Sequence, residues 1–432
     1  MKALRLNRIL LVSLLLTVFV VNSCVPLNTA GVQPTTKQYN FSAIYNPSEK
    51  LFNPEFRIFF NNDTVVLFFY KITKSDLQNI ESVDSQTEMK LLIKYVLRET
   101  NEYRLVDSSV IVQSVDPARK DDIVSYFQIK VPKKTSCKLI VNMSLGSSSE
   151  FQQRVLADID NSNEFSKEHF IFYELNNDEK LIKFNNFVND SVQYVINSSY
   201  FDNFEVNVEY YQFSEYVCVP PYYLVDNTSE VRQPDSVFLY LIGDKIKFDR
   251  KGYYVLKPKK DFESSLCFIN AGEYFPEIKI ISDMLEPLKL ITGNKEYREL
   301  KECSDLKTAI DQFWLSKSNN MKFAKEQIRV FYNRVSLANK FFTEDKPGWK
   351  TDRGNIYVLF GPPSIININT AGEEWFYGEN PELAGVLFVF DKINNINCGS
   401  SLVLRRDSNY QSVWSQAVST WRDGRIYTIT NQ

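Results

Sequence analysis

The 432-residue sequence predicts a multidomain, mainly β protein whose C-terminal part is α+β. Two tandem β-sandwich-like domains would come first, then a helical segment, then a small α+β domain. Short runs of alternating apolar and polar residues, bounded by turn residues, fill residues 41–284. The apolar spacing becomes helical after residue 285. The aromatic content of 14%, mostly Phe and Tyr, also favours strands over helices.

The N-terminal segment has the organisation of an export signal. Lys2, Arg5 and Arg8 precede an apolar run over residues 9–21, shorter than the roughly 20 residues that a membrane-spanning helix needs. The run ends in "VNSC", and this pattern resembles a bacterial lipoprotein signal in which Cys24 becomes lipidated. We expect a signal peptide over residues 1–23 and a polar tether over 24–40. An ordinary secretory peptide cleaved nearby is the alternative.

Residues 41–175 are predicted to form the first β-sandwich-like domain. The stretch "FRIFFNNDTVVLFFYKI" indicates two strands across an Asn-Asn-Asp turn. Four further runs, "KLLIKYVLRE", "SSVIVQSV", "SYFQIKVP" and "CKLIVNMSL", continue at spacings that favour an immunoglobulin-like sandwich. Residues 176–284 contain similar runs, such as "FEVNVEYYQF" and "GYYVLKP", and predict a second β-rich domain.

Residues 285–432 combine helices and strands. Leu306, Ile310 and Phe313 share one helical face, with Ser304 as a possible N-cap. A longer amphipathic helix follows up to Phe342, and Pro347-Gly348 is expected to stop it. We expect strands at "NIYVLF", "EEWFYG", "GVLFVFDK" and "SLVLRR", a helix around Trp414–Trp421, and a closing strand at "DGRIYTIT".

Composition excludes several classes of function. A net charge of −3 argues against a broad electrostatic grip on nucleic acid or anionic lipid. The single histidine, His169, removes most His-based metal sites and most Ser-His or Cys-His nucleophile pairs, and its imidazole is expected to be exposed or hydrogen-bonded. We therefore predict no metal, no cofactor and no catalytic residue.

The cysteines form no recognisable metal or redox motif. Five follow Cys24 and no C-x-x-C is present. Pairing of Cys218 with Cys267 is conceivable in an exported chain, but free thiols are expected for most of the five. No histidine follows His169 in the chain, so Cys398 has no local activating base and is expected to be a turn or core thiol.

The stretch "KPGWKTDRGNIYVLFGPP" at residues 346–363 stands out from its surroundings. A strand running into Gly361-Pro362-Pro363 resembles the entry to a phosphate-binding loop. That loop, however, needs a Gly-Lys-Ser/Thr sequence, which is missing, and prolines remove amide donors. We therefore predict no nucleotide site.

The residues at the start of this stretch each suit a structural turn. Thr351 and Asp352 can bond nearby backbone amides, and Gly354 permits a positive φ. Trp349 would be a buried anchor, and Arg353 would pair with a carboxylate elsewhere in the domain. The alternatives are a binding surface, or a catalytic loop with Asp352 as general base and Arg353 as anion clamp. Nearby acids for that chemistry are Glu373, Glu374 and Asp391, and no spacing selects among them.

These residues resemble the motif of the GWxTD-domain proteins, a family of envelope lipoproteins from Bacteroidetes-type bacteria. The similarity covers roughly residues 285–405, although "LSKSNN" replaces an Arg-Asp-Pro-Thr-Pro-like phrase of the family. The resemblance implies β-rich domains ahead of the motif domain, and it implies no catalytic residue. The matching positions are Gly348, Trp349, Thr351, Asp352, Arg353, Gly354, Gly361, Pro362, Pro363, Trp375 and Tyr377, preceded by Arg334, Ala338 and Asn339.

Signal and motif together predict a lipid-anchored protein of the cell envelope, on the periplasmic side of the outer membrane. Its expected role is a non-enzymatic interaction or assembly component with an envelope protein as partner. No acidic cluster follows Cys24, which disfavours export to the cell surface. One alternative is an envelope enzyme on glycan, cell-wall or peptide substrates that uses carboxylates near Asp352, Glu373 and Glu374. Another is a carbohydrate-binding module with exposed Tyr and Trp.

Overall fold

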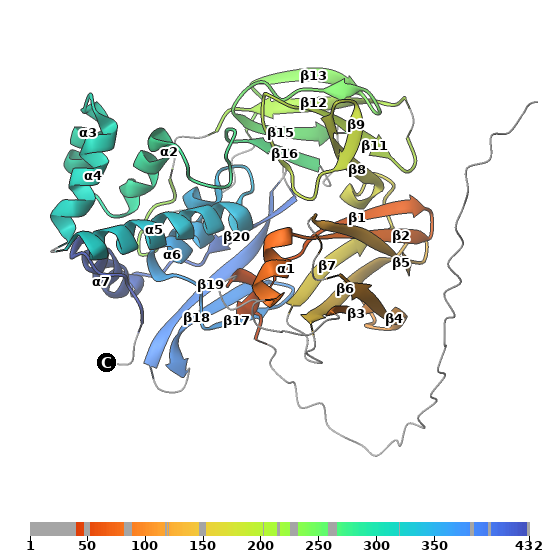
Figure 1. Cartoon of the computed structure of the whole chain (residues 1–432), viewed down its shortest axis with the longest axis horizontal. Coiled ribbons are helices and arrows are strands. Elements are labelled where there is room, and N and C mark those ends of the chain that lie inside the picture. Colours follow the sequence, from red (N-terminus) through yellow and green to blue (C-terminus); the bar gives the residue numbers. More distant parts are fainter. Residues whose placement is uncertain are drawn as a thin grey trace, which may run out of the picture. The chain divides into compact units, whose positions relative to one another are not determined.

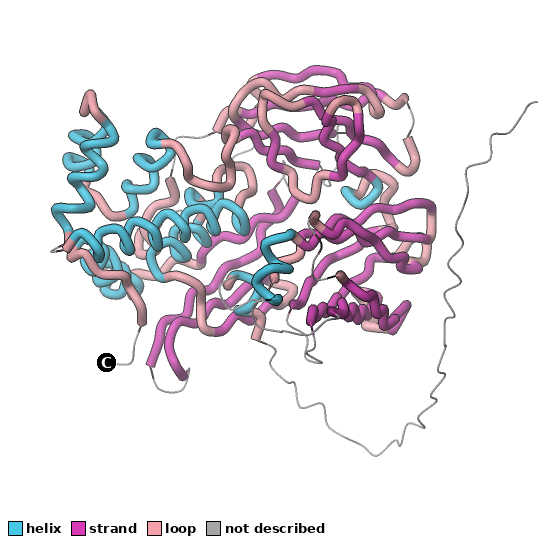
Figure 2. The backbone as a smooth tube through the Cα atoms, in the orientation of Figure 1, coloured by secondary structure: helices cyan, strands magenta, loops and turns pink. Residues whose placement is uncertain are grey.

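The fold is taken from a computed structural model of the full chain (Figures 1 and 2). It describes residues 40–46, 52–81, 89–116, 119, 121–146, 153–201, 203–213, 217–224, 232–257, 266–318, 320–380, 384–395 and 399–429. The predicted signal peptide, Cys24 and Cys398 lie outside the described residues. No helix in the described part of the chain is both long and apolar enough to cross a membrane.

The first domain is a sandwich of two antiparallel sheets. One sheet has the order β1-β2-β5 and the other the order β4-β3-β6-β7. This arrangement of three strands facing four is that of an immunoglobulin-like sandwich, as the sequence predicted. The strands are β1 (Glu55–Asn62), β2 (Val65–Ile72), β3 (Met89–Glu99), β4 (Leu105–Val115), β5 (Ile123–Lys130), β6 (Ser136–Gly146) and β7 (Gln153–Asp160).

Strict alternation along the strands builds the core of this sandwich. On β3, Leu91, Ile93, Tyr95 and Leu97 are buried, while the residues between them face outward. Because side chains alternate between the two faces of a strand, one sheet face supplies the core and the other stays in contact with solvent. Helix α1 (Lys74–Glu81) adds the buried side chain of Leu77 to the same core.

The second domain is also made of two packed sheets, with the orders β10-β16-β15-β12-β13 and β14-β11-β8-β9. The first strand of this sandwich is β8, which begins at Phe170 and pairs with β11 and β9. The strands are β8 (Phe170–Asn176), β9 (Glu179–Ile182), β10 (Phe187–Val188), β11 (Gln193–Ser198), β12 (Glu205–Tyr211), β13 (Ser236–Leu241), β14 (Lys245–Ile246), β15 (Gly252–Lys257) and β16 (Leu266–Asn270).

The two sandwiches contact each other directly. The guanidinium of Arg57 on β1 donates to the carbonyl oxygens of Lys183 and Asn185 and to the side chain of Asn186. The ring of His169, at the end of the short helix η3 (Lys167–His169), stacks on Phe60 of β1 at a centroid distance of 4.2 Å.

The C-terminal part packs helices against a four-stranded sheet of order β17-β18-β19-β20 (Figure 1). Its helices are α2 (Ile281–Leu285), η4 (Glu286–Leu290), α3 (Asn294–Glu302), α4 (Leu306–Lys317), α5 (Met321–Phe342), η5 (Gly348–Lys350), α6 (Asp352–Phe360) and α7 (Tyr410–Arg422). Its strands are β17 (Ile365–Ile368), β18 (Gly372–Asn380), β19 (Ala384–Asn395) and β20 (Gly399–Leu404).

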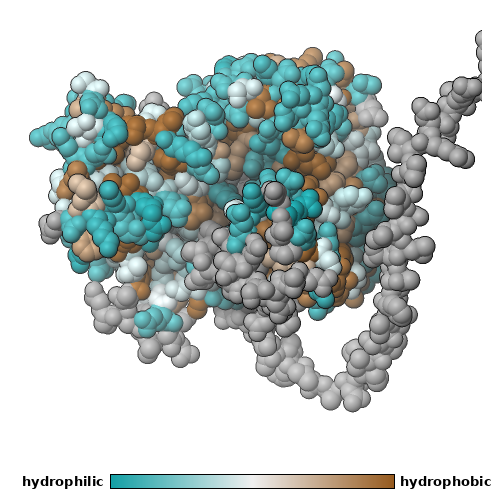
Figure 3. All heavy atoms as spheres, viewed as in Figure 1, coloured by the Kyte–Doolittle hydropathy of each residue, from teal (hydrophilic) through white to brown (hydrophobic). Residues whose placement is uncertain are grey.

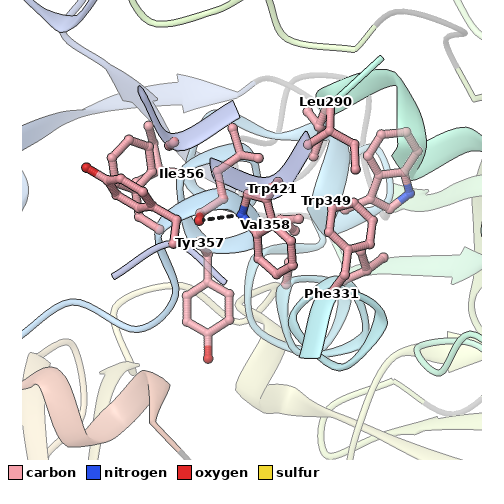
Figure 4. Close-up of a cluster of buried hydrophobic side chains, with 14 of the residues drawn as sticks. Leu290, Phe331, Trp349, Ile356, Tyr357, Val358 and Trp421 are labelled. Atoms are coloured by element: carbon pink, nitrogen blue, oxygen red, sulfur yellow. Dashed lines mark hydrogen bonds between the residues drawn. The ribbon is translucent and has the colours of Figure 1, made fainter. Parts of the chain in front are cut away.

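One large hydrophobic cluster holds this part together. Figure 4 shows Trp349, Phe331 and Trp421 gathered around α6, and the indole nitrogen of Trp421 donates to the carbonyl oxygen of Leu359 at 3.0 Å. The apolar stripe of α5 lies against this cluster through Phe331, Val335, Ala338 and Phe342, as its helical spacing predicted. The outer surface in the view of Figure 3 is largely hydrophilic, with apolar patches between.

Several local predictions were wrong. The segment "NIYVLF" forms the second half of helix α6 and not a strand. Asp305, not Ser304, caps α4 by accepting a hydrogen bond from the amide of Thr308. Helix α5 ends at Phe342, ahead of Pro347-Gly348, and residues 425–429 carry no strand.

Candidate functional site

The motif segment begins where the chain leaves α5 and turns back against it. The hydroxyl of Thr343 accepts a hydrogen bond from the amide of Gly348, and the side chain of Asn339 accepts one from the amide of Trp349. A Cβ atom on Gly348 would lie 1.9 Å from the carbonyl oxygen of Ala338. Gly348 is therefore required because the backbones of η5 and α5 touch at this point.

Thr351 starts the helix that follows. Its hydroxyl accepts from the amide of Gly354 at 3.1 Å and donates to the carbonyl oxygen of Gly348 at 2.7 Å. This is an N-cap, so the expectation that Thr351 bonds a nearby amide is confirmed. Gly354 itself has helical backbone angles; its lack of a side chain matters because a Cβ there would lie 1.8 Å from the carbonyl oxygen of Gly348.

Asp352 connects the motif to the end of β20. One carboxylate oxygen accepts from the guanidinium of Arg406 at 2.6 Å, and the other accepts from the amide of Leu404 at 3.1 Å. The side chains of Asp352 and Arg406 are 6% and 5% exposed, so the pair is shielded from water. The predicted bond from Asp352 to an amide exists, but the amide lies 52 residues away in sequence.

Arg353 lies between two carboxylates. It pairs with Glu344 at 2.7 Å and with Glu373 at 3.4 Å, and its side chain is 10% exposed. Burial alone would lower the pKa of Arg353, but the carboxylates of Glu344 and Glu373 raise it, so the guanidinium stays charged. The expectation that Arg353 pairs with an acid across the domain is confirmed.

Glu373 and Trp375 complete this cluster from β18. The carboxylate of Glu373 accepts from the indole nitrogen of Trp375 at 2.8 Å and from the hydroxyl of Tyr45 at 2.9 Å. Burial is the main cause that raises the pKa of Tyr45, and the phenol stays protonated. The carboxylate of Glu373, the hydroxyl of Tyr45 and the indole nitrogen of Trp375 are thus turned inward, toward one another.

Tyr45 comes from the opposite end of the sequence. It lies on η1 (Ser42–Tyr45), and its carbonyl oxygen accepts from the hydroxyl of Tyr357 at 2.7 Å. The amide of Phe41 donates to Ile366 on β17, and the side chain of Asn40 donates to Ser364. The stretch that leads into the first sandwich therefore belongs to the core of the C-terminal part, and no local sequence signal indicates this.

Arg334 and Gly361 finish the motif helix. The guanidinium of Arg334 donates to the carbonyl oxygens of Val358 and Leu359, at the C-terminal end of α6 where a positive charge is favoured. Burial lowers the pKa of Arg334 to about 10, so it remains charged at neutral pH. Gly361 ends the helix with φ +85°, and Tyr377 donates to its carbonyl oxygen at 2.8 Å. Pro362 is half-buried and Pro363 buried.

A loop of the second sandwich closes over the start of α6. The side chain of Asn355 donates to the carbonyl oxygen of Cys218, and the guanidinium of Arg406 donates to those of Val219 and Pro220. Burial, aided by the negative charge of Asp352, raises the pKa of the Cys218 thiol to about 12. Cys218 is therefore a protonated thiol at neutral pH and a poor nucleophile.

The remaining candidate groups do not gather into a reactive set. Glu374 and Asp391 lie on β18 and β19, where Asp391 pairs with Arg405. Cys137, Cys218 and Cys303 are free thiols, so no disulfide joins Cys218 to Cys267 and that suggested pairing is wrong. Within the described ranges, no three His, Cys, Asp or Glu side chains are placed to hold a metal ion.

A cleft of about 590 Å³ lies elsewhere, where the first sandwich meets the linker to the second. The exposed ring of Tyr200 forms part of its wall, next to the ion pair of Asp63 with Lys133. The side-chain amide of Asn161 donates hydrogen bonds to the carbonyl oxygens of Asp63 and Pro132. The cleft is lined by Asp63, Lys133, Lys134, Asn161, Ser162, Asn163, Glu164, Phe165 and Tyr200, so it contains none of the motif residues.

His169 is buried next to this cleft. Its Nδ1 lies 3.1 Å from the hydroxyl of Ser199, and its ring contacts Tyr200 and Phe60. The imidazole is therefore hydrogen-bonded, as expected. Burial lowers the pKa of His169 to about 4, although the carboxylates of Asp160 and Asp63 act in the opposite direction.

This histidine predicts a pH-dependent stability for the two sandwiches. Between about pH 6.5 and pH 4 the unfolded chain binds a proton at His169 that the folded chain does not, so stability falls as the pH falls. We expect the free energy of unfolding to drop by about 2 kcal/mol from pH 7.5 to pH 5 because of this group. Urea unfolding followed by circular dichroism at a series of pH values measures this change in the free energy of unfolding.

The matched control uses the fact that the chain contains one histidine. His169→Phe keeps a ring against Phe60 and removes the titrating group. The difference between the wild type and this variant in their pH dependence isolates His169 from the carboxylates. An equal loss in both proteins would show that His169 does not titrate as described.

Comparison with known proteins places the motif in a defined domain. Residues 252–423 match the model of the GWxTD domain, a span that begins in β15 and ends just after α7. No curated protein matches the chain. A crystal structure described as a putative beta-galactosidase from Bacteroides fragilis aligns with 32% of this chain and 19% of its own length, at 10% identity and a TM-score of 0.17, which supports no argument about function. Residues 252–423 of this chain form a GWxTD domain.

Proposed function

We propose that this chain is a lipid-anchored protein of the cell envelope that acts as a non-enzymatic interaction or assembly component. The anchor would be Cys24, and the folded part would lie on the periplasmic side of the outer membrane. One observation supports the non-enzymatic role above all: the polar residues Thr351, Asp352 and Arg353 of the motif are buried and bonded to other residues of the chain.

A catalytic role would require these groups to reach a substrate. A general acid or base must come within hydrogen-bonding distance of the proton that it transfers. Asp352 is bonded to Arg406 and Leu404, and Arg353 is bonded to Glu344 and Glu373. These bonds join α6 to β18, to β20 and to the loop that follows α5, so the motif acts as a joint between separate segments.

Asp352→Asn distinguishes this role from the enzymatic alternative. The amide keeps an acceptor for Leu404 but leaves the buried guanidinium of Arg406 without its counter-charge. Because an unpaired buried charge is costly, we expect the free energy of unfolding to fall by about 2 kcal/mol or more. Urea unfolding followed by tryptophan fluorescence gives this number.

Asp407→Asn is the control, because that carboxyl is exposed and lies next to Arg406 in sequence. We expect its effect to stay within about 0.5 kcal/mol. If Asp352→Asn unfolds like the wild type, the joint is not a structural element. If that variant also loses turnover of a glycan or peptide substrate, the motif is a catalytic site instead.

Three measurements on the full-length protein test its placement and partner. The mass of the N-terminal peptide from isolated membranes should include acyl chains on Cys24, and an unmodified Cys24 would contradict the anchor.

Protease added to intact cells should leave the protein whole, and rapid digestion would contradict the periplasmic side. In mild detergent the protein should be recovered in a complex of defined stoichiometry, and a lone monomer would count against an assembly role.

The cleft beside His169 supports a second candidate, glycan binding. An exposed aromatic ring beside carboxylate, amide and ammonium groups is the chemistry that recognises a sugar face and its hydroxyls. Binding of envelope glycan fragments that is lost in Tyr200→Ala would support this role. If the wild-type protein binds no glycan on an array, the glycan-binding role is rejected.

A further inference from the structure

One outward sheet face of the first sandwich carries an unusual combination of side chains. On β3, Lys90 and Lys94 are exposed and alternate with Leu92 and Val96. On the neighbouring edge strand β4, Val110 and Val112 are 58% and 62% exposed. We call these six residues the basic face.

The register of the strands places these residues together. Val110 lies opposite Lys94 and Val112 lies opposite Leu92, so each lysine has aliphatic neighbours on the same side of the sheet. Lys90 and Lys94 are not paired with any acid among the described residues. The same sheet does carry an ion pair on its other two strands, between Lys138 on β6 and Asp158 on β7.

Exposed aliphatic side chains next to two unpaired lysines indicate a partner that is both apolar and anionic. A second copy of the same face is a poor partner, because lysines would oppose lysines. An added peptide strand would use the edge of β4 and would leave Lys90 and Lys94, on the next strand in, in water. An anionic lipid surface meets both needs, with headgroups for the lysines and the acyl boundary for the valines.

The described chain begins beside the sheet that carries this face. The described chain starts at Asn40, and η1 (Ser42–Tyr45) contacts β7, the other edge strand of the same sheet. The strands of the sheet, β4-β3-β6-β7, are about 4.8 Å apart, so β4 lies roughly 15 Å across from β7. Residues 25–39 can span roughly 50 Å when extended.

We propose that the basic face rests on the anionic lipid headgroups of the membrane that carries the Cys24 anchor. This inference depends on the proposed anchor for its membrane but not for its chemistry. The net charge of −3 does not exclude it, because the contact uses local charge on one sheet face. The first sandwich would thus lie against the membrane.

Amine labelling of the acylated full-length protein tests the proposal. The protein is incorporated into vesicles of phosphatidylcholine alone, or with a quarter of phosphatidylglycerol, and labelled lysines are quantified by mass spectrometry. We expect Lys90 and Lys94 to be labelled severalfold more slowly on the anionic vesicles, and high salt to remove the difference. Lys295, whose side chain is 92% exposed on α3, is the internal control and should label equally on both. Equal labelling of Lys90 and Lys94 on both vesicle types would overturn the proposal.

Flotation of unacylated full-length protein, in which Cys24 is replaced by Ser, separates this proposal from the anchor. Lys90→Gln and Lys94→Gln should each weaken its binding to anionic vesicles about fivefold, since one lysine near such a surface contributes about 1 kcal/mol. Lys295→Gln should have no effect. If the acylated protein binds neutral vesicles and the unacylated protein does not, that difference tests the anchor alone. Unchanged binding in Lys90→Gln and Lys94→Gln would reject the basic face while leaving the anchor intact.

Discussion

Arg353→Ala is expected to lower the free energy of unfolding of the GWxTD domain by about 3 to 5 kcal/mol. The substitution removes the cation that lies between Glu344 and Glu373, and both carboxylates remain in surroundings from which water is largely excluded. Urea unfolding followed by tryptophan fluorescence reports on this domain alone. The five tryptophans of the chain are Trp314, Trp349, Trp375, Trp414 and Trp421, all within the matched residues.

Arg405→Ala is the matched control for that experiment. Arg405 also pairs with a carboxylate, Asp391 at 2.6 Å, but its side chain is 65% exposed. An ion pair in water contributes little, so we expect a loss below about 1 kcal/mol. The loss of unfolding free energy in Arg353→Lys should lie between those of Arg353→Ala and Arg405→Ala, because an ammonium cannot bridge both acids as a guanidinium does. Similar losses in Arg353→Ala and Arg405→Ala would contradict the buried cluster.

Gly354→Ala is expected to destabilise the domain by about 3 kcal/mol. Helix propensity alone predicts the opposite sign, since alanine is favoured over glycine inside a helix by about 1 kcal/mol. The added methyl group would lie 1.8 Å from the carbonyl oxygen of Gly348, however, and would push α6 away from η5. The same fluorescence measurement gives the change in stability.

Gly293→Ala provides the control for backbone entropy. Gly293 precedes α3, and a Cβ atom there would meet no atom within 4 Å. We expect a change smaller than about 1 kcal/mol in either direction. A stabilised Gly354→Ala variant would show that η5 and α6 are further apart than described.

The β architecture could be predicted because its signal is local. Residues 89–98 alternate between buried and outward positions without a break, and one register error would reverse every side chain. The stripe of α5 was equally clear for the same reason.

Helix α6 could not be predicted from periodicity, because every residue from Asp352 to Phe360 is buried. A run with no exposed side fits a buried strand as well as a buried helix, and Ile356, Tyr357 and Val358 favour strands by composition. The informative signals were the ends: Thr351 as N-cap and Gly361 as the residue that stops the helix.

The motif site was predictable only in part, for a related reason. The cap formed by Thr351 is local and was expected from its residue type. Asp352, in contrast, bonds the amide of Leu404, 52 residues away, and Tyr45 is separated from its partner Glu373 by 328 residues. Such long-range pairs leave no trace in one sequence.

The motif residues therefore share a structural explanation. Gly348 and Gly354 allow three backbone segments to touch, Thr351 starts the helix, and Asp352 and Arg353 attach it to β20 and β18. Arg334, Ala338 and Asn339 of α5 contact the same segment from the other side. In this arrangement the polar residues position the fold and leave no group directed toward solvent.

Carboxyl labelling of the folded full-length protein tests this most directly. A water-soluble carbodiimide with an amine modifies exposed carboxyl groups, and mass spectrometry locates them. We expect exposed Asp407 to react readily, and Asp352 and Glu373, at 6% and 7% exposure, to react only when urea unfolds the domain. If Asp352 reacts as fast as Asp407 in the folded protein, the motif is open to solvent and is not a buried joint.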